Sequence, residues 1–256
     1  MANVLSIVNQ KGGVGKTTTS VNLAAYLAEL HKKVLVIDLD PQGNATSGFG
    51  IEKPSLTSSI YDVLVNDTPI EEVIQKSTWK NLSICPTNID LAGAEVELVT
   101  AMSRETILKR AIAGIQDKYD YVLIDCPPSL GLLTVNALAA STGVIVPIQG
   151  EYYAMEGLTQ LVDTINLVRK HLNPQIGIFG VVITMFDGRT QLTRQVTSEV
   201  KSYFGDKVFN TVIPRNIRLA EAPSFGKSIA EYDRKSRGGE AYLSLAKEVI
   251  ARVKKQ

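Results

Sequence analysis

One short segment near the start of the chain constrains its fold more than any other. An apolar run, residues 3–9, is joined to a segment of helical length, residues 17–30, by the glycine-rich sequence QKGGVGKTT. Closely spaced glycines let successive backbone N–H groups turn inward, and the helix that follows points its positive end into the same space. Such a loop holds phosphate groups and needs a strand before it and a helix after it. The segment therefore predicts an α/β fold with a phosphate site.

The rest of the chain alternates between apolar runs and segments of helical length. The strand-like runs are residues 3–9, 33–40, 82–86, 121–127, 143–148, 177–185 and 208–214, and the clearest helical segments are 17–30, 156–171 and 239–254. Several runs are continuous in Val, Ile and Leu, which is typical of parallel strands covered on both faces. We expect one domain, residues 1–256, with a doubly wound, mostly parallel sheet flanked by helices. Residues 54–100 read as a helical excursion from it.

The composition is that of an ordinary soluble protein. Hydrophobic residues make up 45% of the chain and charged residues 21%, which excludes a disordered or fibrous chain. No apolar run is long enough for a transmembrane helix, and the N-terminal sequence lacks the layout of a signal peptide. Cys85 and Cys126 lack metal-ligand spacing, and His31 and His171 belong to no cluster. We expect a cytoplasmic protein.

The loop departs from the usual pattern G-x-x-x-x-G-K-[ST] in one respect. Gln10 stands where the first glycine belongs, and a second lysine, Lys11, follows it. The remaining positions fit the pattern: Lys16 is expected to contact the β and γ phosphates, and the hydroxyl of Thr17 is expected to ligate Mg²⁺. We therefore expect a working phosphate loop of an unusual type.

Two other strand-like runs end in carboxylates. Asp125 ends the run YVLID, at the edge of the sheet where ligands bind in open α/β folds, and fits a Walker B acid that acts through a metal-bound water. Asp38 and Asp40 end the run VLVIDLD, and side-chain alternation along a strand predicts that they share a face. One of them would meet the metal or the loop while the other orients an attacking water. The alternative is a pair of aspartates that cap turns.

Four blocks of sequence resemble the ParA/Soj family of chromosome- and plasmid-partitioning ATPases. The blocks are KGGVGKTT, DLDPQGNAT, YVLIDCPPSLG and VIPRNIRLAEAPSFGKSI, and the resemblance extends over residues 4–254. The family belongs to the MinD/ParA group of deviant Walker A P-loop NTPases. The resemblance implies ATP and Mg²⁺ as cofactors, and a slow, partner-stimulated hydrolysis of ATP to ADP and phosphate.

The resemblance also implies a role for the extra lysine. In this family the residue at the position of Lys11 reaches the nucleotide of the partner subunit when two ATP-bound monomers form a sandwich dimer. Such a residue resembles an arginine finger supplied in trans, which contributes roughly 10³–10⁵ in rate. Loss of the first glycine would accommodate a loop whose task includes dimerisation.

Further site residues follow from the resemblance. Asp40 would orient the hydrolytic water, with Asp125 as the Walker B acid and both near the metal through water. Pro127 and Pro128 would stiffen the loop after Asp125, a sensor of the γ-phosphate, and Glu151 would reach the ribose or the partner subunit. The implied catalytic residues are Lys11, Lys16, Asp40 and Asp125. The implied ATP-binding residues are Lys11, Gly12, Gly13, Val14, Gly15, Lys16, Thr17, Thr18, Pro214 and Asn216, the last two framing adenine.

The partners implied by the resemblance are non-specific double-stranded DNA and a ParB-type centromere-binding protein, with no membrane. The ATP-dependent homodimer would bind DNA and associate with the nucleoid. Residues 187–237 carry ten Lys or Arg and six Asp or Glu, an excess that suits an anionic partner. Arg189 and Arg218 are the favoured DNA contacts. Other basic residues near them in sequence are Arg215, Lys227, Arg234 and Arg237.

Three other functions share the loop. A MinD-like membrane-associated positioning ATPase would need an amphipathic C-terminal helix, and the stripe there has no Phe or Trp, so we interpret it as a docked core helix. The stripe is Leu243, Ala246, Val249, Ile250 and Val253. An electron-transfer ATPase of the nitrogenase iron-protein type needs cysteines in glycine-rich loops, unlike the segment LSICPTN. A metabolic ligase could use the same loop, but the IPRN and GRT blocks argue against that function.

Overall fold

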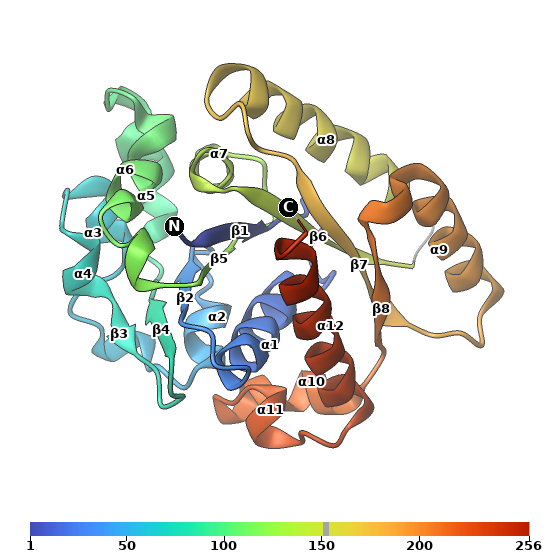
Figure 1. The fold of residues 1–256 in the computed structure, drawn as a ribbon. Coiled ribbons are helices and arrows are strands. Elements are labelled where there is room, and N and C mark those ends of the chain that lie inside the picture. The colour runs from blue at the N-terminus through green and yellow to red at the C-terminus, as the bar shows by residue number, and fades with distance from the viewer. Residues whose placement is uncertain (151–153, 256) are drawn as a thin grey trace.

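The computed structural model describes residues 1–150 and 154–255, and folds them around one eight-stranded sheet (Figure 1). The strands are β1 (Asn3–Ile7), β2 (Val34–Asp38), β3 (Gln75–Lys76), β4 (Leu82–Cys85), β5 (Tyr121–Asp125), β6 (Gly143–Gln149), β7 (Ile178–Phe186) and β8 (Val208–Pro214). Their order in the sheet is β3-β4-β2-β5-β1-β6-β7-β8. Every neighbouring pair is parallel except β3 with β4. The doubly wound, mostly parallel sheet predicted from the sequence is confirmed.

Helices cover both faces of the sheet. They are α1 (Lys16–Glu29), α2 (Asn44–Gly48), α3 (Ile60–Val65), α4 (Ile70–Val73), α5 (Leu91–Glu97), α6 (Ile107–Ala113), α7 (Leu132–Ala140), α8 (Ala154–His171), α9 (Gln191–Phe204), α10 (Ile217–Glu221), α11 (Ile229–Tyr232) and α12 (Arg237–Val253). In Figure 1, α1 and α12 lie below the sheet, and α7 and α8 lie above it.

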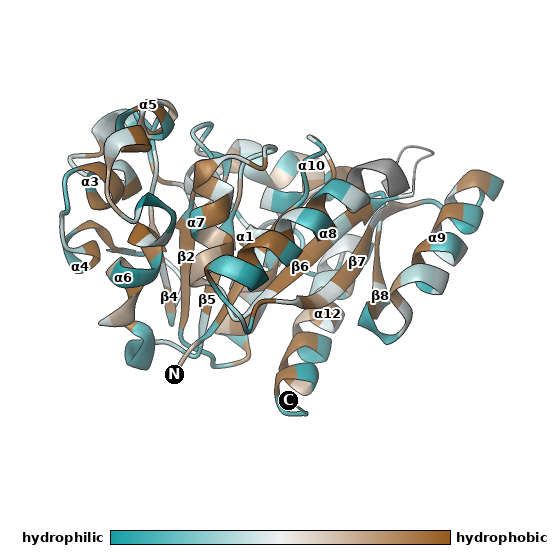
Figure 2. Cartoon of the chain, turned by 90° about the horizontal axis from the view of Figure 1, so that it is seen from above, coloured by the Kyte–Doolittle hydropathy of each residue, from teal (hydrophilic) through white to brown (hydrophobic). Residues whose placement is uncertain are grey.

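The sheet separates two apolar clusters because successive strand side chains point to opposite faces. In β1, Val4 belongs to the cluster that contains residues of α6 and α7, whereas Leu5 belongs to the cluster that contains residues of α1 and α12. All five residues of β2 and of β5 are buried, which is why these runs are continuously apolar rather than alternating. Figure 2 shows the same strands as hydrophobic along most of their length.

Two expectations about strand bounds were wrong. The expected run 33–40 ends as a strand at Asp38, so the alternation argument does not extend to Asp40. Residues 54–100 are not simply a helical excursion, because besides short helices they contain β3 and β4. β3 is a two-residue antiparallel edge strand, too short and too polar to give a periodic signal in the sequence.

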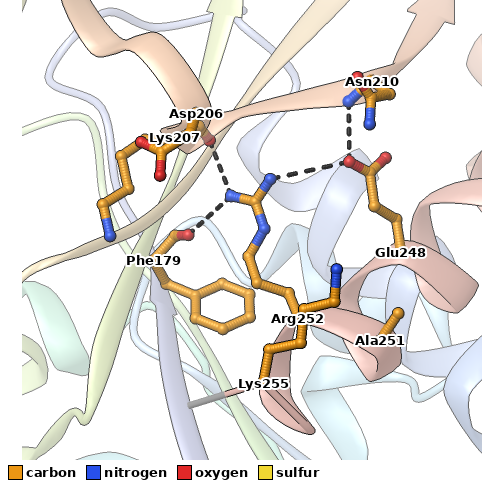
Figure 3. A pocket seen from close by; sticks show the side chains of 8 residues that line it. All are labelled: Phe179, Asp206, Lys207, Asn210, Glu248, Ala251, Arg252 and Lys255. Carbon is orange, nitrogen blue, oxygen red and sulfur yellow. Dashed lines mark hydrogen bonds and ion pairs between the residues drawn. The ribbon is translucent and has the colours of Figure 1, made fainter.

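The C-terminal helix α12 is docked against the sheet, as predicted. Ala246 and Val249 are fully buried, and the other members of its apolar stripe pack against the same cluster. Arg252 donates 2.9 Å hydrogen bonds to the carbonyls of Phe179 and Lys207 (Figure 3). Its guanidinium also lies 4.2 Å from the ring centre of Phe209. Nowhere in the described part of the chain is a helix long and apolar enough to span a bilayer.

Candidate nucleotide site

The glycine-rich loop joins β1 to α1 at the carboxyl edge of the sheet. Gly13 and Gly15 have φ values of 75° and 85°, in the left-handed region where a side chain is strained. Gly15 is the N-cap of α1, so the backbone turns sharply just before the helix begins. The sequence prediction of a strand, a glycine turn and a helix is confirmed, and the helix starts at Lys16.

Two side chains that sequence reasoning missed fix the shape of this loop. Asn9 donates to the carbonyl of Pro147 at 2.8 Å and accepts from the backbone N–H of Lys11 at 3.0 Å. Thr184, in β7, donates its hydroxyl to the carbonyl of Val14 at 2.8 Å. The loop is therefore held by β7 and by the end of β6 as well as by its own strand.

Gln10, in place of the usual first glycine, reaches away from the loop. Its amide donates to the side chain of Gln160 in α8 at 3.2 Å. The position therefore links the loop to α8, which a glycine cannot do.

Lys16 is folded into the loop. Its Nζ donates to the carbonyl of Lys11 at 3.0 Å, and only 6% of the residue is exposed. Burial lowers the pKa of Lys16, while the negative charges of Asp125 and Asp40 oppose that change. The ammonium group thus lies among carboxylates and backbone carbonyls, where a phosphate would be a better partner than the Lys11 carbonyl.

Asp125 presents an unused oxygen to this site. Its Oδ1 accepts from Ser20 at 2.8 Å, while its Oδ2 is buried and has no hydrogen-bond partner within the described residues. Burial, reinforced by the charge of Asp38, raises the pKa of Asp125 to about 8, and the hydroxyls of Thr17 and Ser20 partly offset the rise. A buried carboxylate oxygen without a donor fits a metal-bound water, so the residues present suit Mg²⁺.

Asp38 and Asp40 differ in the hydrogen bonds that their side chains make. Both oxygens of Asp38 are engaged: Oδ2 accepts from the N–H and hydroxyl of Thr46, each at 2.7 Å, and Oδ1 accepts from the N–H of Asp40 at 3.2 Å. Burial raises the pKa of Asp38 to about 6 in spite of these bonds. Asp38 therefore holds the following turn in place, which favours Asp40 as the residue left to face a water or metal.

Asp40 lies just beyond β2, in a turn that the structure holds tightly. Its Oδ1 accepts from the N–H of Gln42 at 3.0 Å, and Lys53 donates to the carbonyl of Gln42 at 2.6 Å. Its charge acts on both Lys16 and Asp125. Asp40 therefore caps this turn through Oδ1, as the turn-capping alternative expected.

A cavity of about 500 Å³ adjoins the loop. Gly15 and Thr18 contribute to its wall, together with Thr184 and the two residues expected to frame adenine, Pro214 and Asn216. Asn216 also caps α10, because its side chain accepts from the N–H of Arg218 at 2.8 Å. Gly15 and Asn216, far apart in sequence, are therefore brought to one cavity beside the loop.

Two prolines and two cysteines named in the sequence analysis lie within the described residues. Pro127 is buried and Pro128 exposed, directly after Asp125. Cys85 and Cys126 are both free and buried. Glu151 lies outside the described residues.

The two favoured arginines are ion-paired in this structure. Arg189 Nη2 lies 2.7 Å from Asp187 Oδ2, and its hydrogen bonds lower the pKa of Asp187 to about 2. Arg218 Nη1 lies 2.9 Å from Glu221, with Asp233 at 3.6 Å from Nε. Arg189 is almost fully exposed and Arg218 about half exposed. Both can therefore reach an anion by exchanging one partner for another.

Sequence comparison finds similar proteins over nearly the whole chain. A family model of the AAA domain matches residues 2–178. The sporulation initiation inhibitor protein Soj of Bacillus subtilis is 59% identical, over 98% of this chain and 99% of that protein. The chromosome partitioning protein ParA of Myxococcus xanthus is 51% identical, over 98% and 89%. The chromosome-partitioning ATPase Soj of Treponema pallidum is 50% identical, over 98% of each chain.

Solved structures with the same fold include ones with nucleotide. Cobyrinic acid a,c-diamide synthase from Mycobacterium smegmatis, with bound ADP and magnesium, has a TM-score of 0.88 and 38% identity, covering 99% of this chain and 96% of that one. The septum site-determining protein MinD from Pyrococcus horikoshii, complexed with Mg-ADP, has a TM-score of 0.79 and 27% identity, covering 99% of both. The P-loop ATPase fold is therefore shown, and the MinD structure is the more distant of the two.

Proposed function

The chain belongs to the ParA/Soj family of chromosome-partitioning ATPases, and on that premise we propose that it is an ATP-dependent dimerising switch. In this proposal the ATP-bound dimer binds DNA without sequence preference and drives chromosome or plasmid segregation with a ParB-type partner. Hydrolysis returns it to the monomer. In this proposal it works in the cytoplasm and associates with the nucleoid when ATP is bound.

The observation that carries the proposal is the convergence of three features on one loop. The glycine turn supplies backbone donors for phosphates, Asp125 has a buried oxygen with no hydrogen-bond partner among the described residues, and the adjoining cavity extends to Pro214 and Asn216. Together they match the phosphates, the metal and the base of Mg-ATP. A phosphate loop without the other two features would not select a nucleoside triphosphate.

The chain's own residues divide the work as follows. On binding, Nζ of Lys16 leaves the Lys11 carbonyl for the β and γ phosphates, while loop N–H groups and the start of α1 hold the phosphate oxygens. Thr17 and Asp125 would hold Mg²⁺, Asp125 through water; the ion supplies charge neutralisation at the phosphates. Asp40, fixed by Asp38 and Gln42, orients the attacking water.

Dimerisation enters through Lys11. It lies at the bend of the loop, with its backbone N–H bonded to Asn9 and its carbonyl to Lys16. Across a sandwich interface its side chain would reach the phosphates of the partner subunit and neutralise charge there. When Lys16 moves onto ATP it releases the Lys11 carbonyl, so ATP binding and the conformation of the dimerising loop are linked.

DNA contact is assigned to Arg189 and Arg218, with Arg215, Lys227, Arg234 and Arg237 as further candidates. Two half-surfaces that bind weakly in the monomer act together in the dimer, which gives ATP control over DNA binding. The MinD-like alternative needs the apolar face of α12 for a membrane, and that face is buried against the sheet. The sequence identity to the diamide synthase, 38%, is lower than the 59% identity to the Soj protein of Bacillus subtilis.

The test is binding of a random-sequence duplex at several salt concentrations, with ATP, with ADP and without nucleotide. Wild type is compared with Arg218→Glu. We expect salt-sensitive binding that requires ATP and is lost in Arg218→Glu. An absence of DNA binding in every nucleotide state, with the dimer verified by sizing, would reject the proposal.

A further inference from the structure

A second concave, charged surface lies at the opposite edge of the sheet from the phosphate loop. It is a hollow of about 470 Å³, formed where strands begin rather than where they end. Its wall comes from the residues just before β2, β4 and β5 and from β3. Segments widely separated in sequence thus meet at one place. We call it the basic hollow.

The basic hollow takes its name from its charges. Among the described residues, four lysines and no carboxylate line it; the lysines are Lys33, Lys76, Lys80 and Lys118. Lys118 lies 3.6 Å from Glu71, whereas the other three form no ion pair within residues 1–150 and 154–255. At the margin of the hollow, the carboxylate of Asp120 accepts a 2.7 Å hydrogen bond from the backbone N–H of Lys33. The hollow therefore carries more positive than negative side chains, even with Glu71 beside Lys118 and Asp120 beside the backbone of Lys33.

The frame that carries these lysines is well defined. Between Lys76 and Leu82 the chain makes a turn in which the N–H of Trp79 bonds to the hydroxyl of Ser77 at 3.2 Å, and Asn81 has a φ of 67°. The carbonyl of Asn81 accepts from Val34 at 2.8 Å, tying the turn to β2. The ring of Trp79 packs against the core. Its Nε1 is buried and lacks a hydrogen-bond partner in the described part of the chain.

Protection of the sheet edge does not account for all four lysines. Lysines on an edge strand discourage pairing with another chain, and this explains Lys76 in β3. Lys33 and Lys118 instead precede β2 and β5, which are interior strands of the sheet. Their convergence with Lys80 on one concave surface needs another reason, and an anionic ligand supplies it.

We propose that the basic hollow binds the phosphate backbone of duplex DNA, as a contact separate from Arg189 and Arg218. The proposal rests on the DNA-binding function proposed above. Lysine ammonium groups on flexible stems suit contacts with phosphates irrespective of sequence. In a sandwich formed through the loop edges of two sheets, the hollow lies at the edge that stays open. One dimer then presents two further DNA contacts that face away from its interface.

The chain carries its own reporter for this site, because Trp79 is its single tryptophan. Wild-type protein, already saturated with Mg-ATP, is titrated with a random-sequence duplex while tryptophan emission is recorded. Parallel titrations use poly-glutamate and inorganic phosphate. We expect a saturable change with the duplex that weakens as salt rises. The proposal is overturned if poly-glutamate changes the tryptophan emission and the duplex does not. It is also overturned if millimolar phosphate alone produces the same saturable change.

A matched pair of variants makes the test independent of fluorescence. The first is Lys33→Ala/Lys76→Ala/Lys80→Ala; the control is Lys109→Ala/Lys170→Ala/Lys247→Ala, which removes three exposed lysines that do not line the hollow. We expect the first variant to dimerise with ATP but to bind DNA at least tenfold more weakly at about 0.1 M salt. Its log–log salt slope falls by about 0.9 for each lost phosphate contact.

The outcomes separate this proposal from the function it rests on. If wild type binds DNA with ATP and both variants bind equally well, the hollow is not a DNA site and the switch stands. If wild type binds no DNA in any nucleotide state, both proposals fail. A first variant that is weakened while the control is not supports the hollow.

Discussion

Asp38 and Asp125 are paired in register across the neighbouring strands β2 and β5, and both carboxyl groups are fully buried. Such a pair is stable without ligand only if protons or nearby cations offset the two charges. Burial raises the pKa of both groups, to about 8 for Asp125 and about 6 for Asp38; the charge of Asp38 adds to the rise at Asp125, and the bonds from Thr46 limit it at Asp38. The strand pairing thus creates a place for positive charge beside the loop.

This relationship predicts how the ligand-free protein responds to pH. The pKa of Asp125 is higher in the folded protein than in the unfolded chain, where it is near 4, so folding is favoured while the group keeps its proton. The stability contributed by this proton is present below about pH 4 and is lost as the pH rises towards 8. Asp125→Asn removes the effect, which is on the order of a few kcal/mol.

Thermal unfolding of ligand-free protein between pH 5 and 8.5 measures this. We expect the melting temperature of wild type to fall more steeply with pH than that of Asp125→Asn. Parallel curves for the two proteins would show that Asp125 does not titrate in this range. Ser20→Ala, which removes the hydroxyl bonded to Oδ1, should shift the Asp125 titration to still higher pH.

Asp40 combines a structural and a chemical role, and two substitutions separate them. Asp40→Ala removes both the turn cap to Gln42 and the carboxylate, whereas Asp40→Asn keeps an acceptor for that cap. We expect both variants to bind ATP and to remain on DNA as dimers, with ATP hydrolysis reduced by roughly 10²–10⁴. Phosphate release and the rate of dissociation from DNA are the measurements. Normal hydrolysis by Asp40→Ala would remove Asp40 from the mechanism.

The phosphate site could be predicted from the sequence to the extent that its residues are neighbours along the chain. The strand, the glycine turn and Lys16 form one continuous segment, and Asp125 ends an unmistakably apolar strand. Thr184 could not be found this way: it is 170 residues from Val14, and a threonine in an apolar strand has no local signature. The division of labour between Asp38 and Asp40 likewise depends on Thr46, which only the folded chain brings to Asp38.

Thr184 gives a test of how the loop is held. Thr184→Val keeps the size of the side chain but leaves the buried carbonyl of Val14 without its donor, a loss of about 1–3 kcal/mol. We expect a lower melting temperature and weaker ATP binding, because the loop is no longer fixed in its binding shape. Thr184→Ser keeps the hydroxyl and should bind ATP nearly as wild type does. Equal ATP affinity of Thr184→Val and wild type would show that this bond does not shape the loop.

The ion pair between Arg189 and Asp187 predicts a gain of DNA binding. Asp187→Asn keeps an acceptor for the backbone N–H of Arg189 but removes the negative charge that competes with phosphate for its guanidinium. If Arg189 contacts DNA, the ATP-bound variant should bind a random duplex several-fold more tightly. Fluorescence anisotropy at several salt concentrations measures this, with Arg189→Ala/Asp187→Asn as the control that should lose the gain. A gain that persists in the double variant would place the effect elsewhere.

Gly12 tests whether the loop lies at a subunit interface. A Cβ built on Gly12 meets no atom of the described residues within 4 Å, and its φ is not in the left-handed region, so the described part of the monomer tolerates a side chain there. We expect Gly12→Val to fold and bind ATP but to fail to dimerise, because its side chain occupies space that the partner's loop would need. Gly15→Val, at a φ of 85°, should instead lose stability and ATP binding as a monomer. The measurement is the molecular mass of Gly12→Val in solution with ATP. A normal dimer would mean that the two phosphate loops do not meet at the subunit interface.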